Sequence, residues 1–395
     1  MGALRVAVVG GGIGGLAAAN ALLQKGLDVT VYEQASALAE VGAGLTLQPN
    51  GVRSMRRLGF GAAVERWGAR VRDSQHLRAD GAFVGAMLTP ELAERREMYG
   101  MHRADLLGML AKQLPPGTVQ TGHRCVGFEQ DEARATVHFA NGLTASADVV
   151  VAADGIHSAL QRFVVEPSPP LPAGSVAYRG VISAASVGWP DGAFRNWMGT
   201  GKHFLVYPVR AGELINYVGF VQTDEQTRES WSAVGDPATL ANHFSGWDPM
   251  VEAICARVTT TFWWGLYDRE PLRSWSRGRL TLLGDAAHPM LPHAGQGANQ
   301  AIEDGVALAT ILAQADRASV PEALRLYQSV RWQHTARVQG MARANGRRYD
   351  SAVGDLALRD REMGRQASDR AWIWDYDAEA EATKALAHAS GGAVD

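Results

Sequence analysis

The chain has 395 residues, of which 46% are apolar and 20% are charged, as in a globular protein long enough for more than one hydrophobic core. Its formal net charge of -3 gives no electrostatic reason to bind nucleic acid or an anionic membrane surface. The two cysteines, Cys125 and Cys255, are far apart and argue against a disulfide framework or a zinc site. We therefore expect no metal and a reducing, cytoplasmic setting, and we find neither an export signal nor an apolar run of about 18 residues that would span a membrane.

The chain begins with an apolar strand at residues 6–9, a glycine-rich turn, a helix at 16–24 and a second strand. In such a unit the first glycine of Gly-x-Gly-x-x-Gly makes the tight turn, the second lets the backbone approach a pyrophosphate, and the third lets helix and strand pack closely. An acidic residue at the end of the second strand is placed to accept hydrogen bonds from a ribose. The pattern predicts a dinucleotide site formed by Gly10, Gly12, Gly15 and Glu33.

The next segments continue this nucleotide-binding half. A turn-rich stretch at 40–51 precedes a predicted helix at 52–58, and another helix starts just after Arg103, which can bridge from there to a phosphate or ribityl oxygen. Apolar alternation predicts short antiparallel strands, with Asn141-Gly142 as a hairpin turn. These strands are expected at 119–123, 135–139 and 144–146, before the chain returns to the nucleotide sheet at 147–153.

A proline-rich stretch at 166–172 predicts a linker at a domain boundary. Alternating segments after it predict a mostly antiparallel sheet that forms one wall of a substrate pocket, with helices at 237–257. The five expected strands are 176–181, 194–198, 203–210, 214–222 and 259–267. His203 and Tyr207 are four residues apart and therefore share one face of their strand, with Leu205 between them.

A third motif lies near the C-terminal end, where a buried strand at 280–284 runs into Gly284-Asp285-Ala286-Ala287-His288-Pro289. Gly295 and Gly297 follow in a turn that leads into a helix at 298–312. The glycines let backbone N–H groups approach a ligand, and the helix start carries about half a positive charge. This arrangement suits an anion or a ring that becomes anionic on reduction.

The remaining C-terminal segments are predicted to be helical at 320–350 and 356–370. We expect the aromatic patch at 372–376 either to cover the nucleotide-binding domain or to join a dimer contact. The sequence therefore leaves both a monomer and a homodimer as alternatives. The Ala-, Glu- and Gly-rich tail at 380–395 is expected to fray.

The two glycine-rich motifs and a third segment, Asp154-Gly155 within residues 149–158, occur in the order found in the class A FAD-dependent aromatic monooxygenases. The chain resembles this family from about residue 5 to about 376, and residues 203–216 and 267–271 resemble its salicylate and 3-hydroxybenzoate hydroxylase branch. The family usually has an arginine three residues after the serine of the Asp-Gly segment, whereas this chain has Gln161, followed by Arg162. That departure puts in doubt a nicotinamide-nucleotide contact at this position.

The resemblance implies that His203 and Tyr207 face an aromatic substrate, with Gln296 as a further hydrogen-bonding candidate and His288 and His293 ranked lower as bases. It also implies a set of residues that hold FAD. Besides the glycines, Glu33 and Arg103 named above, these are Gly44, Asp154, Asp285, Pro292, Gly295, Gly297 and Ala298.

The expected fold is α/β, with a Rossmann-like FAD-binding domain built on a parallel sheet, a mostly antiparallel substrate-domain sheet and C-terminal helices. We expect the FAD-binding domain at 1–75, 95–165 and 275–350, and the substrate-binding domain at 76–94 and 166–274. The C-terminal helices and tail would take up 351–395.

The implied reaction uses NAD(P)H to reduce FAD, and O2 to form a C4a-hydroperoxyflavin that hydroxylates a small phenolic acid such as salicylate or 3-hydroxybenzoate. A phenolate reacts faster than a phenol with this electrophile, so a histidine titrating near neutrality would help by taking the phenolic proton. Three alternatives stay open: a hydroxylase of a hydroxypyridine carboxylic acid similar to 6-hydroxynicotinate, a flavin dehydrogenase or reductase, and a non-catalytic flavin-binding sensor. No second glycine-rich βαβ unit is present in the sequence, so the pyridine nucleotide would visit the flavin transiently.

Overall fold

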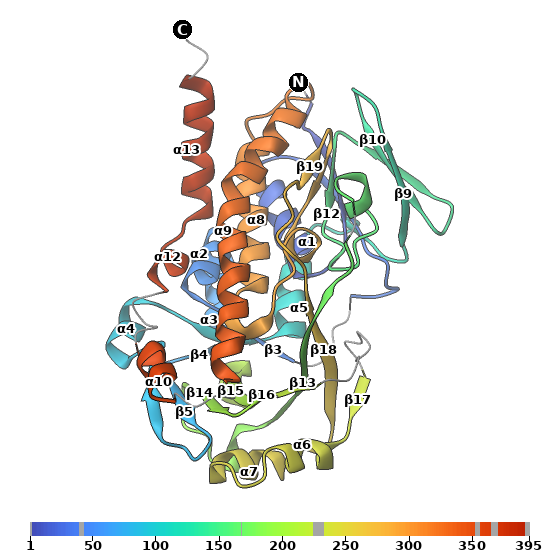
Figure 1. Cartoon of the computed structure of the whole chain (residues 1–395). Coiled ribbons are helices and arrows are strands. Elements are labelled where there is room, and N and C mark those ends of the chain that lie inside the picture. Colours follow the sequence, from blue (N-terminus) through green and yellow to red (C-terminus); the bar gives the residue numbers. More distant parts are fainter. Residues whose placement is uncertain are drawn as a thin grey trace.

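A six-stranded and an eight-stranded sheet form the upper and lower parts of the computed structural model (Figure 1). The structure describes residues 2–38, 43–166, 168–223, 233–351, 356–364 and 370–391. The upper sheet has the order β19-β20-β12-β1-β2-β8, and its strands are parallel except for β19. Their bounds are β19 Ser276–Arg277, β20 Leu280–Leu282, β12 Val149–Ala152, β1 Arg5–Val9, β2 Asp28–Tyr32 and β8 Val119–Gln120.

The strands of this sheet are apolar because both faces are covered. Helices α1 (Ile13–Gln24), α5 (Arg103–Gln113) and α8 (Gly297–Leu312) pack together on one side. A three-stranded antiparallel sheet of β9 (Cys125–Gln130), β10 (Ala135–Phe139) and β11 (Thr144–Ala147) contacts β1 and β12. The prediction that 119–123 belongs to that antiparallel group was wrong. Only β8 is a strand there, and it pairs in parallel with β2 through hydrogen bonds from the Val31 and Glu33 N–H groups.

The lower sheet has the order β17-β18-β13-β16-β15-β14-β5-β6, and all its neighbouring strands are antiparallel except β14 and β5. Its strands are β17 Ala233–Gly235, β18 Thr261–Asp268, β13 Leu171–Ser183, β16 Leu214–Gln222, β15 Lys202–Val209, β14 Ala193–Gly199, β5 Asp73–Arg78 and β6 Phe83–Gly85. The parallel and antiparallel sheets confirm the predicted fold class.

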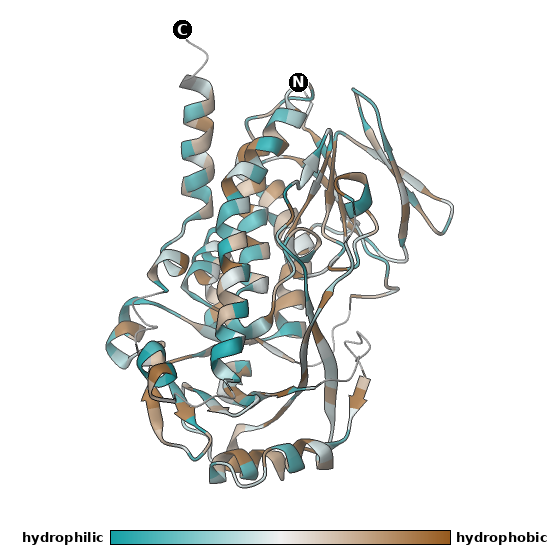
Figure 2. Cartoon of the chain, viewed as in Figure 1, coloured by the Kyte–Doolittle hydropathy of each residue, from teal (hydrophilic) through white to brown (hydrophobic). Residues whose placement is uncertain are grey.

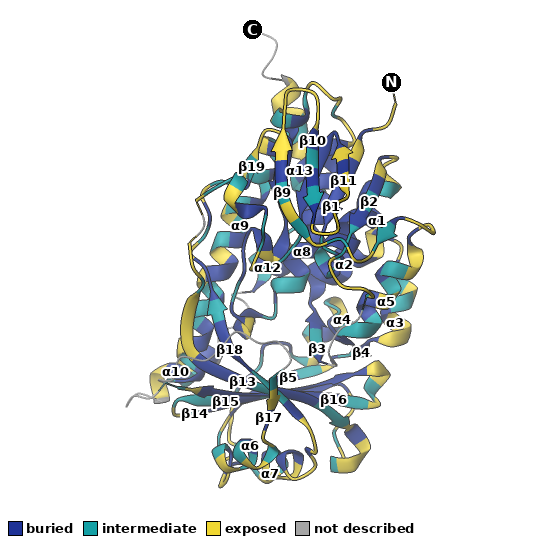
Figure 3. Ribbon diagram, turned by 90° about the vertical axis from the view of Figure 1, so that its right-hand side faces the viewer, coloured by how far each residue is buried: buried dark blue, intermediate teal, exposed yellow. Residues whose placement is uncertain are grey.

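The two faces of the lower sheet have different neighbours. Helices α6 (Pro237–His243) and α7 (Pro249–Cys255) cover the outer face, where Phe204 and Val206 join their apolar core (Figure 3). Alternation along β15 then turns His203, Leu205 and Tyr207 to the inner face. The predicted face of His203 and Tyr207 therefore looks toward the upper part of the molecule.

Two details of this sheet differ from expectation. Strand β13 begins at Leu171, inside the predicted linker, whose residue 167 lies outside the described residues. Strands β5 and β6 were not predicted, because β5 is polar, and β5 begins at Asp73, before the expected domain border at 76. Its inward Ser74 is satisfied by accepting hydrogen bonds from the Met87 and Leu88 N–H groups. The domain borders stay a prediction.

A small sheet of β3 (Gly44–Leu47), β7 (Tyr99–His102) and β4 (Ala69–Arg70) joins the two parts. The predicted helix at 52–58 is α2, which begins earlier, at Pro49. Other short helices are α3 Gly61–Trp67 and α4 Pro90–Arg95, and further along the chain are the 3-10 turns η1 Gln161–Phe163, η2 Ala184–Val187 and η3 Arg210–Gly212.

Helix α9 (Val320–Tyr349) runs from the upper sheet to the lower one (Figure 1). Shorter helices follow, α10 (Leu356–Gly364), α12 (Ala371–Trp374) and α13 (Ala378–Gly391). The expectation of a fraying tail was wrong for residues 380–391, while 392–395 lie outside the described residues. Helix α13 has alternating hydropathy (Figure 2), and it buries Ala378 and Ala382 in the core, packing on α8 and α9.

The aromatic patch at 372–376 turns inward. Trp374 is buried and its indole N–H donates to Gln48 Oε1 at 2.9 Å, while Tyr376 donates to Val330 O and stacks on His334. Across the described residues, we find no helix with the length and apolarity of a membrane span.

The contact between α1 and α8 depends on a glycine, and this generates our first prediction. A Cβ on Gly305 would lie 2.8 Å from the backbone N and Cα of Ala18, whereas one on Gly340, in exposed α9 surface, would meet nothing within 4 Å. Helix propensity alone favours alanine over glycine by about 1 kcal/mol. We expect Gly340→Ala to raise the free energy of unfolding and Gly305→Ala to lower it, as measured by chemical denaturation. Stabilisation by both substitutions would contradict the close helix contact.

Candidate functional site

A cavity of about 380 Å³ lies between the inner face of the lower sheet and the glycine-rich turns of the upper part. It brings together most of the residues that the sequence singled out. Those that line it are Gly12, Gly44, Arg103, His203, Tyr207, Asp285, Pro292, Gly295, Gln296, Gly297 and Ala298, and Gly155 lines it in place of Asp154.

The three glycines of the first turn have different surroundings. A Cβ on Gly10, whose φ is +111°, would lie 2.2 Å from Ala153 O, and one on Gly15 would lie 2.0 Å from Gly10 O. The protein itself therefore requires glycine at both positions. A Cβ on Gly12 would meet nothing within 4 Å, which leaves open space at the position where a pyrophosphate is predicted to pass.

Glu33 stands at the end of β2 beside this turn. Its carboxylate accepts hydrogen bonds from the N–H groups of Gly11 at 2.6 Å and Ala35 at 2.7 Å. The side chain thus lies next to the glycine turn, as a ribose-binding acid requires.

Gly44 lines the cavity, and Asp154 precedes the lining residue Gly155. The Gly44 N–H donates to Asn216 Oδ1 at 2.7 Å, and a Cβ on Gly44 would lie 2.8 Å from the Asn216 side chain. Asp154 Oδ2 accepts from the Ala159 N–H, but Oδ1 is buried and has no hydrogen-bond partner among the described residues. Burial raises the pKa of Asp154. A buried acceptor without a partner fits a site in which a hydroxyl group of a bound cofactor donates the missing hydrogen bond.

The motif at 284–298 forms the wall opposite the sheet. It contains two short 3-10 turns, η4 (Gly284–Ala286) and η5 (Pro292–Ala294), before α8 begins at Gly297. Asp285 points to the cavity from the first turn. The first N–H groups of α8 have no intrahelical partner, so this end of the cavity carries partial positive charge.

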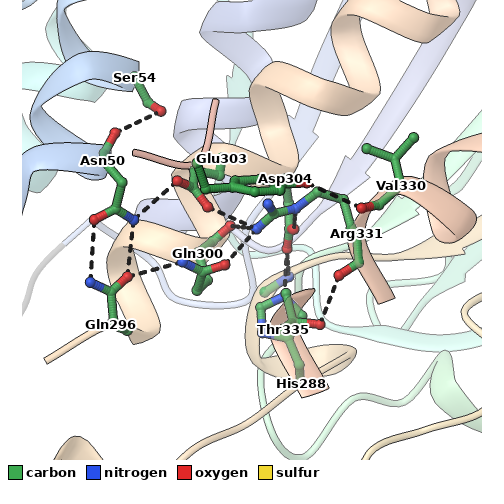
Figure 4. A network of polar contacts seen from close by, with 12 residues as sticks. Asn50, Ser54, His288, Gln296, Gln300, Glu303, Asp304, Val330, Arg331 and Thr335 are labelled. Atoms are coloured by element: carbon green, nitrogen blue, oxygen red, sulfur yellow. Dashed lines mark hydrogen bonds and ion pairs between the residues drawn. The ribbon is translucent and has the colours of Figure 1, made fainter. Parts of the chain in front are cut away.

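Asp304, on α8, fixes the first of these turns (Figure 4). Its Oδ2 accepts from the Gly284 N–H at 3.0 Å and is 2.6 Å from His288 Nε2, while Oδ1 accepts from Arg331 Nε at 2.8 Å. Burial alone would raise the pKa of Asp304, but His288 and Arg331 lower it to about 2. His288 is therefore engaged in holding the turn together.

Gln296 lines the cavity, but its amide is occupied by the protein (Figure 4). Its Nε2 donates to Gln48 and Asn50, and its Oε1 accepts from Asn50 and Gln300. Both donor hydrogens and both acceptor positions of the amide are used, which leaves no donor for a substrate. The geometry makes Gln296 a link between α2 and α8, and its predicted substrate contact stays untested.

The substrate end of the cavity is the inner face of the lower sheet. His203 Nδ1 lies 2.6 Å from Asp350 Oδ1, and its ring stacks on Phe220 with centroids 4.1 Å apart. Tyr207 stacks on Phe194 at 5.8 Å, and burial raises its pKa far above the usual value. Four residues of strand span about 13 Å, so His203 and Tyr207 mark two ends of the wall, with Leu205 between them.

Sequence reasoning missed several residues that line this end or act on it. They are His76, Arg179, Asn196, Asn216, Tyr349, Asp350 and Arg370. Arg179 gave a usable signal, because it is a charged residue on the inward face of an alternating strand. Asp350 gave none, because it follows a long helix and meets His203 only in the folded chain.

Gln161, at the position where the family usually has an arginine, is buried and donates from Nε2 to Ala286 O at 2.9 Å. Arg162 is directed elsewhere, donating to Val126 O and lying over the Phe163 ring. In this chain the residue at this position, Gln161, therefore stabilises the η4 turn through its hydrogen bond to Ala286 O.

Comparison with known proteins agrees with this geometry. A family model described as an FAD binding domain matches residues 3–342. The chain is 38% identical over 388 residues to 3-amino-4-hydroxybenzoate 2-monooxygenase PtmB3 of Streptomyces platensis, covering 95% of this chain and 96% of that protein. It is 34% identical over 353 residues to 6-hydroxynicotinate 3-monooxygenase of Pseudomonas fluorescens, with coverage of 86% and 91%. A solved salicylate hydroxylase substrate complex superposes with a TM-score of 0.85 at 29% identity, covering 97% and 98% of the two chains.

The chain belongs to the class A FAD-dependent aromatic monooxygenases. The predicted family, enzyme class and FAD cofactor are thereby confirmed, and NAD(P)H is the co-substrate typical of these monooxygenases. The residues present fit FAD: open space at Gly12, an unpaired acceptor at Asp154, Asp285 in the cavity wall and the α8 N-terminus. The individual residue contacts stay predictions.

The open space at Gly12 generates a prediction about cofactor binding in this hydroxylase. Gly12→Ala should leave the melting temperature of the apoprotein unchanged but weaken FAD binding by about tenfold or more, equivalent to about 1.4 kcal/mol. Titration of apoprotein with FAD measures this, with Gly108→Ala, another position with nothing within 4 Å, as the control. Unchanged FAD affinity in Gly12→Ala would show that the pyrophosphate passes elsewhere.

A second prediction concerns the buried Glu303 of the hydroxylase. Burial raises its pKa from 4.5 to about 7, despite the opposing effects of Arg331 and Asn50. The folded state therefore binds more protons than the unfolded state between these values, so the contribution of Glu303 to stability is complete below about pH 4.5 and is lost as the pH rises through about 7. Glu303→Gln should reduce the fall in melting temperature across this window. Glu362→Gln, which removes an exposed pair with Arg348, is the control and should leave the slope unchanged.

Proposed function

We propose that this hydroxylase acts on a small benzoic acid that carries a phenolic hydroxyl, such as salicylate, 3-hydroxybenzoate or 3-amino-4-hydroxybenzoate, and that His203 accepts the phenolic proton. The observation that carries the proposal is the position of His203. Its imidazole lines the cavity, stacks on Phe220 and is held from behind by Asp350.

The charges of the cavity support an acidic substrate. The arginines among the lining residues are Arg103, Arg179 and Arg370, whereas Asp285 is the one carboxylate among them. Arg370 is buried, donates to Ala294 O and interacts with Tyr349, and no ion pair to a carboxylate is found for it among the described residues. Burial lowers the pKa of Arg370, so an anionic substrate group nearby would offset the cost of its charge.

The lining of the substrate end supports an aromatic ring. Phe220, Leu205 and Trp264 give this end of the cavity apolar walls. Such walls exclude water and favour a planar ring over a flexible chain.

When bound, FAD supplies the redox chemistry: it takes electrons from NAD(P)H and passes them to O2, which provides the inserted oxygen atom. The residues of the chain orient the ring and control its proton. Transfer of the phenolic proton to His203 leaves the electron pair on the substrate oxygen and makes the ring more nucleophilic. Arg179 and Arg370 would hold the carboxylate meanwhile.

The proposal predicts that His203→Ala uncouples the reaction. The variant should bind FAD and be reduced by NAD(P)H normally, but hydroxylate about 10²–10⁴-fold more slowly and release hydrogen peroxide. The measurement is O2-dependent NAD(P)H oxidation with a panel of hydroxybenzoates, with products identified by mass spectrometry and peroxide quantified. Matched hydroxybenzamides should react poorly, because they lack the carboxylate.

The same panel would contradict the proposal if His203→Ala still couples NAD(P)H oxidation to hydroxylation as wild type does. It would also contradict the proposal if the amides react as well as the acids. A hydroxypyridine carboxylate is a second candidate, favoured by the identity to 6-hydroxynicotinate 3-monooxygenase, and should be included in the panel. Substrate oxidation without O2 would indicate a dehydrogenase, and absence of turnover with every compound would favour a binding protein.

A further inference from the structure

We propose that Asp350 is a positioning residue for hydroxylation: it accepts the Nδ1–H of His203 and so keeps Nε2 unprotonated and directed to the cavity. The inference rests on the proposed role of His203 and adds to it the group that makes the imidazole a base. Asp350 lies beyond residue 342, where the match to the family model ends.

The position of Asp350 is fixed from two directions. It directly follows Tyr349, the last residue of α9, and its N–H donates to Gly346 O at 3.1 Å. Its backbone carbonyl accepts from the N–H of Gly201, two residues before His203 in the turn that leads into β15. The main chain therefore ties the end of α9 to this turn, while the side chain reaches His203 at 2.6 Å. A site supported on rigid elements in this way holds its geometry well.

The His203 ring has little room to change its orientation. Phe220 stacks on one face with an interplanar angle of 15°, and Tyr349 and His293 lie with ring centroids at 5.2 Å and 5.1 Å. Turning the ring over would also break the bond to Asp350. Since an ionised carboxylate can only accept, the ring nitrogen facing Asp350 must carry the hydrogen. The neutral imidazole then has its lone pair on Nε2, and among the described residues the hydrogen bond found for this ring is the one at Nδ1.

Among the described residues, His203 lies against a carboxylate. His293, from η5, is buried, and burial followed by the nearby His203 lowers its pKa well below the usual value. Tyr349 from α9 lies beside His203, and two further titratable residues, Arg370 and His76, contact Tyr349. Among the described residues, Asp350 is the carboxylate within ion-pair distance of His203. It would therefore balance the imidazolium charge, whose burial without a partner would be costly.

The proton movement is balanced within these groups. The phenolic O–H bond breaks, its electron pair stays on the substrate oxygen, and the proton bonds to His203 Nε2. Asp350 stays ionised and keeps its hydrogen bond to Nδ1–H, as the orienting carboxylate does in other Asp–His pairs.

The test compares Asp350→Asn with wild type in the FAD-loaded enzyme. Glu362→Gln is the control, because it removes an α10 carboxylate that pairs with Arg348 near the end of α9. Nitrogen-15 NMR of histidine-labelled protein, with His203→Ala used for assignment, reports the tautomer without any substrate. We expect Nδ1–H on His203 in wild type and in Glu362→Gln, and loss of that single tautomer in Asp350→Asn. With 3-amino-4-hydroxybenzoate as the probe, Asp350→Asn should hydroxylate about 10²-fold more slowly, with unchanged flavin reduction and melting temperature. Asp350→Glu should restore part of the coupling.

The outcomes separate this inference from the proposed function. Unchanged coupling in His203→Ala would overturn the proposed base itself. Loss of coupling in His203→Ala, together with a wild-type tautomer and wild-type coupling in Asp350→Asn, would overturn only the role of Asp350. If the two residues act as one unit, the double variant should be no slower than His203→Ala alone, because the effects of coupled residues are not additive. If the probe is not turned over, the tautomer decides: Nε2–H on wild-type His203 overturns the inference.

Discussion

The carboxylate of Asp304 is the contact on which the cofactor side of the structure depends. It is fully buried, and in a low-dielectric interior an isolated carboxylate would be costly. Three donors surround it: the main chain at Gly284, the imidazole of His288 and the guanidinium of Arg331. One side chain thus fixes the turn that presents Asp285, connects that turn to α8, and connects both to α9. Removing one member of such a set leaves its partners buried and unpaired. We therefore expect substitution of any one of these residues to destabilise the whole set.

The rest of the site follows from two surfaces that the fold brings face to face. The upper surface is made of glycine turns and a helix N-terminus, whose groups are backbone amides. The lower surface is a sheet face, whose groups are side chains at alternating positions. Backbone groups suit a cofactor with phosphates and ring carbonyls, and exchangeable side chains suit a substrate that differs between relatives. The common frame and the variety of substrates named among the relatives are consistent with this division.

Most of the elements and site residues that could be predicted from the sequence were predicted from patterns within short segments of the chain. The glycine turns, the strands of both sheets and the shared face of His203 and Tyr207 depend on neighbours within about ten residues, and periodicity records such relations. Strand β5 escaped because its inward Ser74 and His76 are polar, so alternation gave no signal. The pairings of Asp350 with His203 and of Gln296 with Asn50 join residues 147 and 246 positions apart, and no spacing rule encodes them. The tail misled for another reason: its alanine-rich composition suggested fraying, but small side chains let α13 pack closely on α8 and α9.

Helix α9 carries Arg331 near its middle and Asp350 just past its end, and thereby serves both sides of the active site. The 19 positions between them correspond to about 28 Å along a helix at 1.5 Å per residue. Because the helix is rigid, it fixes both the distance and the rotation between these two residues. Inserting or deleting one residue between these positions would shift Asp350 by about 1.5 Å and turn it by about 100° around the axis, away from His203. In related chains we therefore expect insertions and deletions to occur in the loops and after residue 350. The number of residues between 331 and 350 should stay the same, even where the exposed residues of this interval differ.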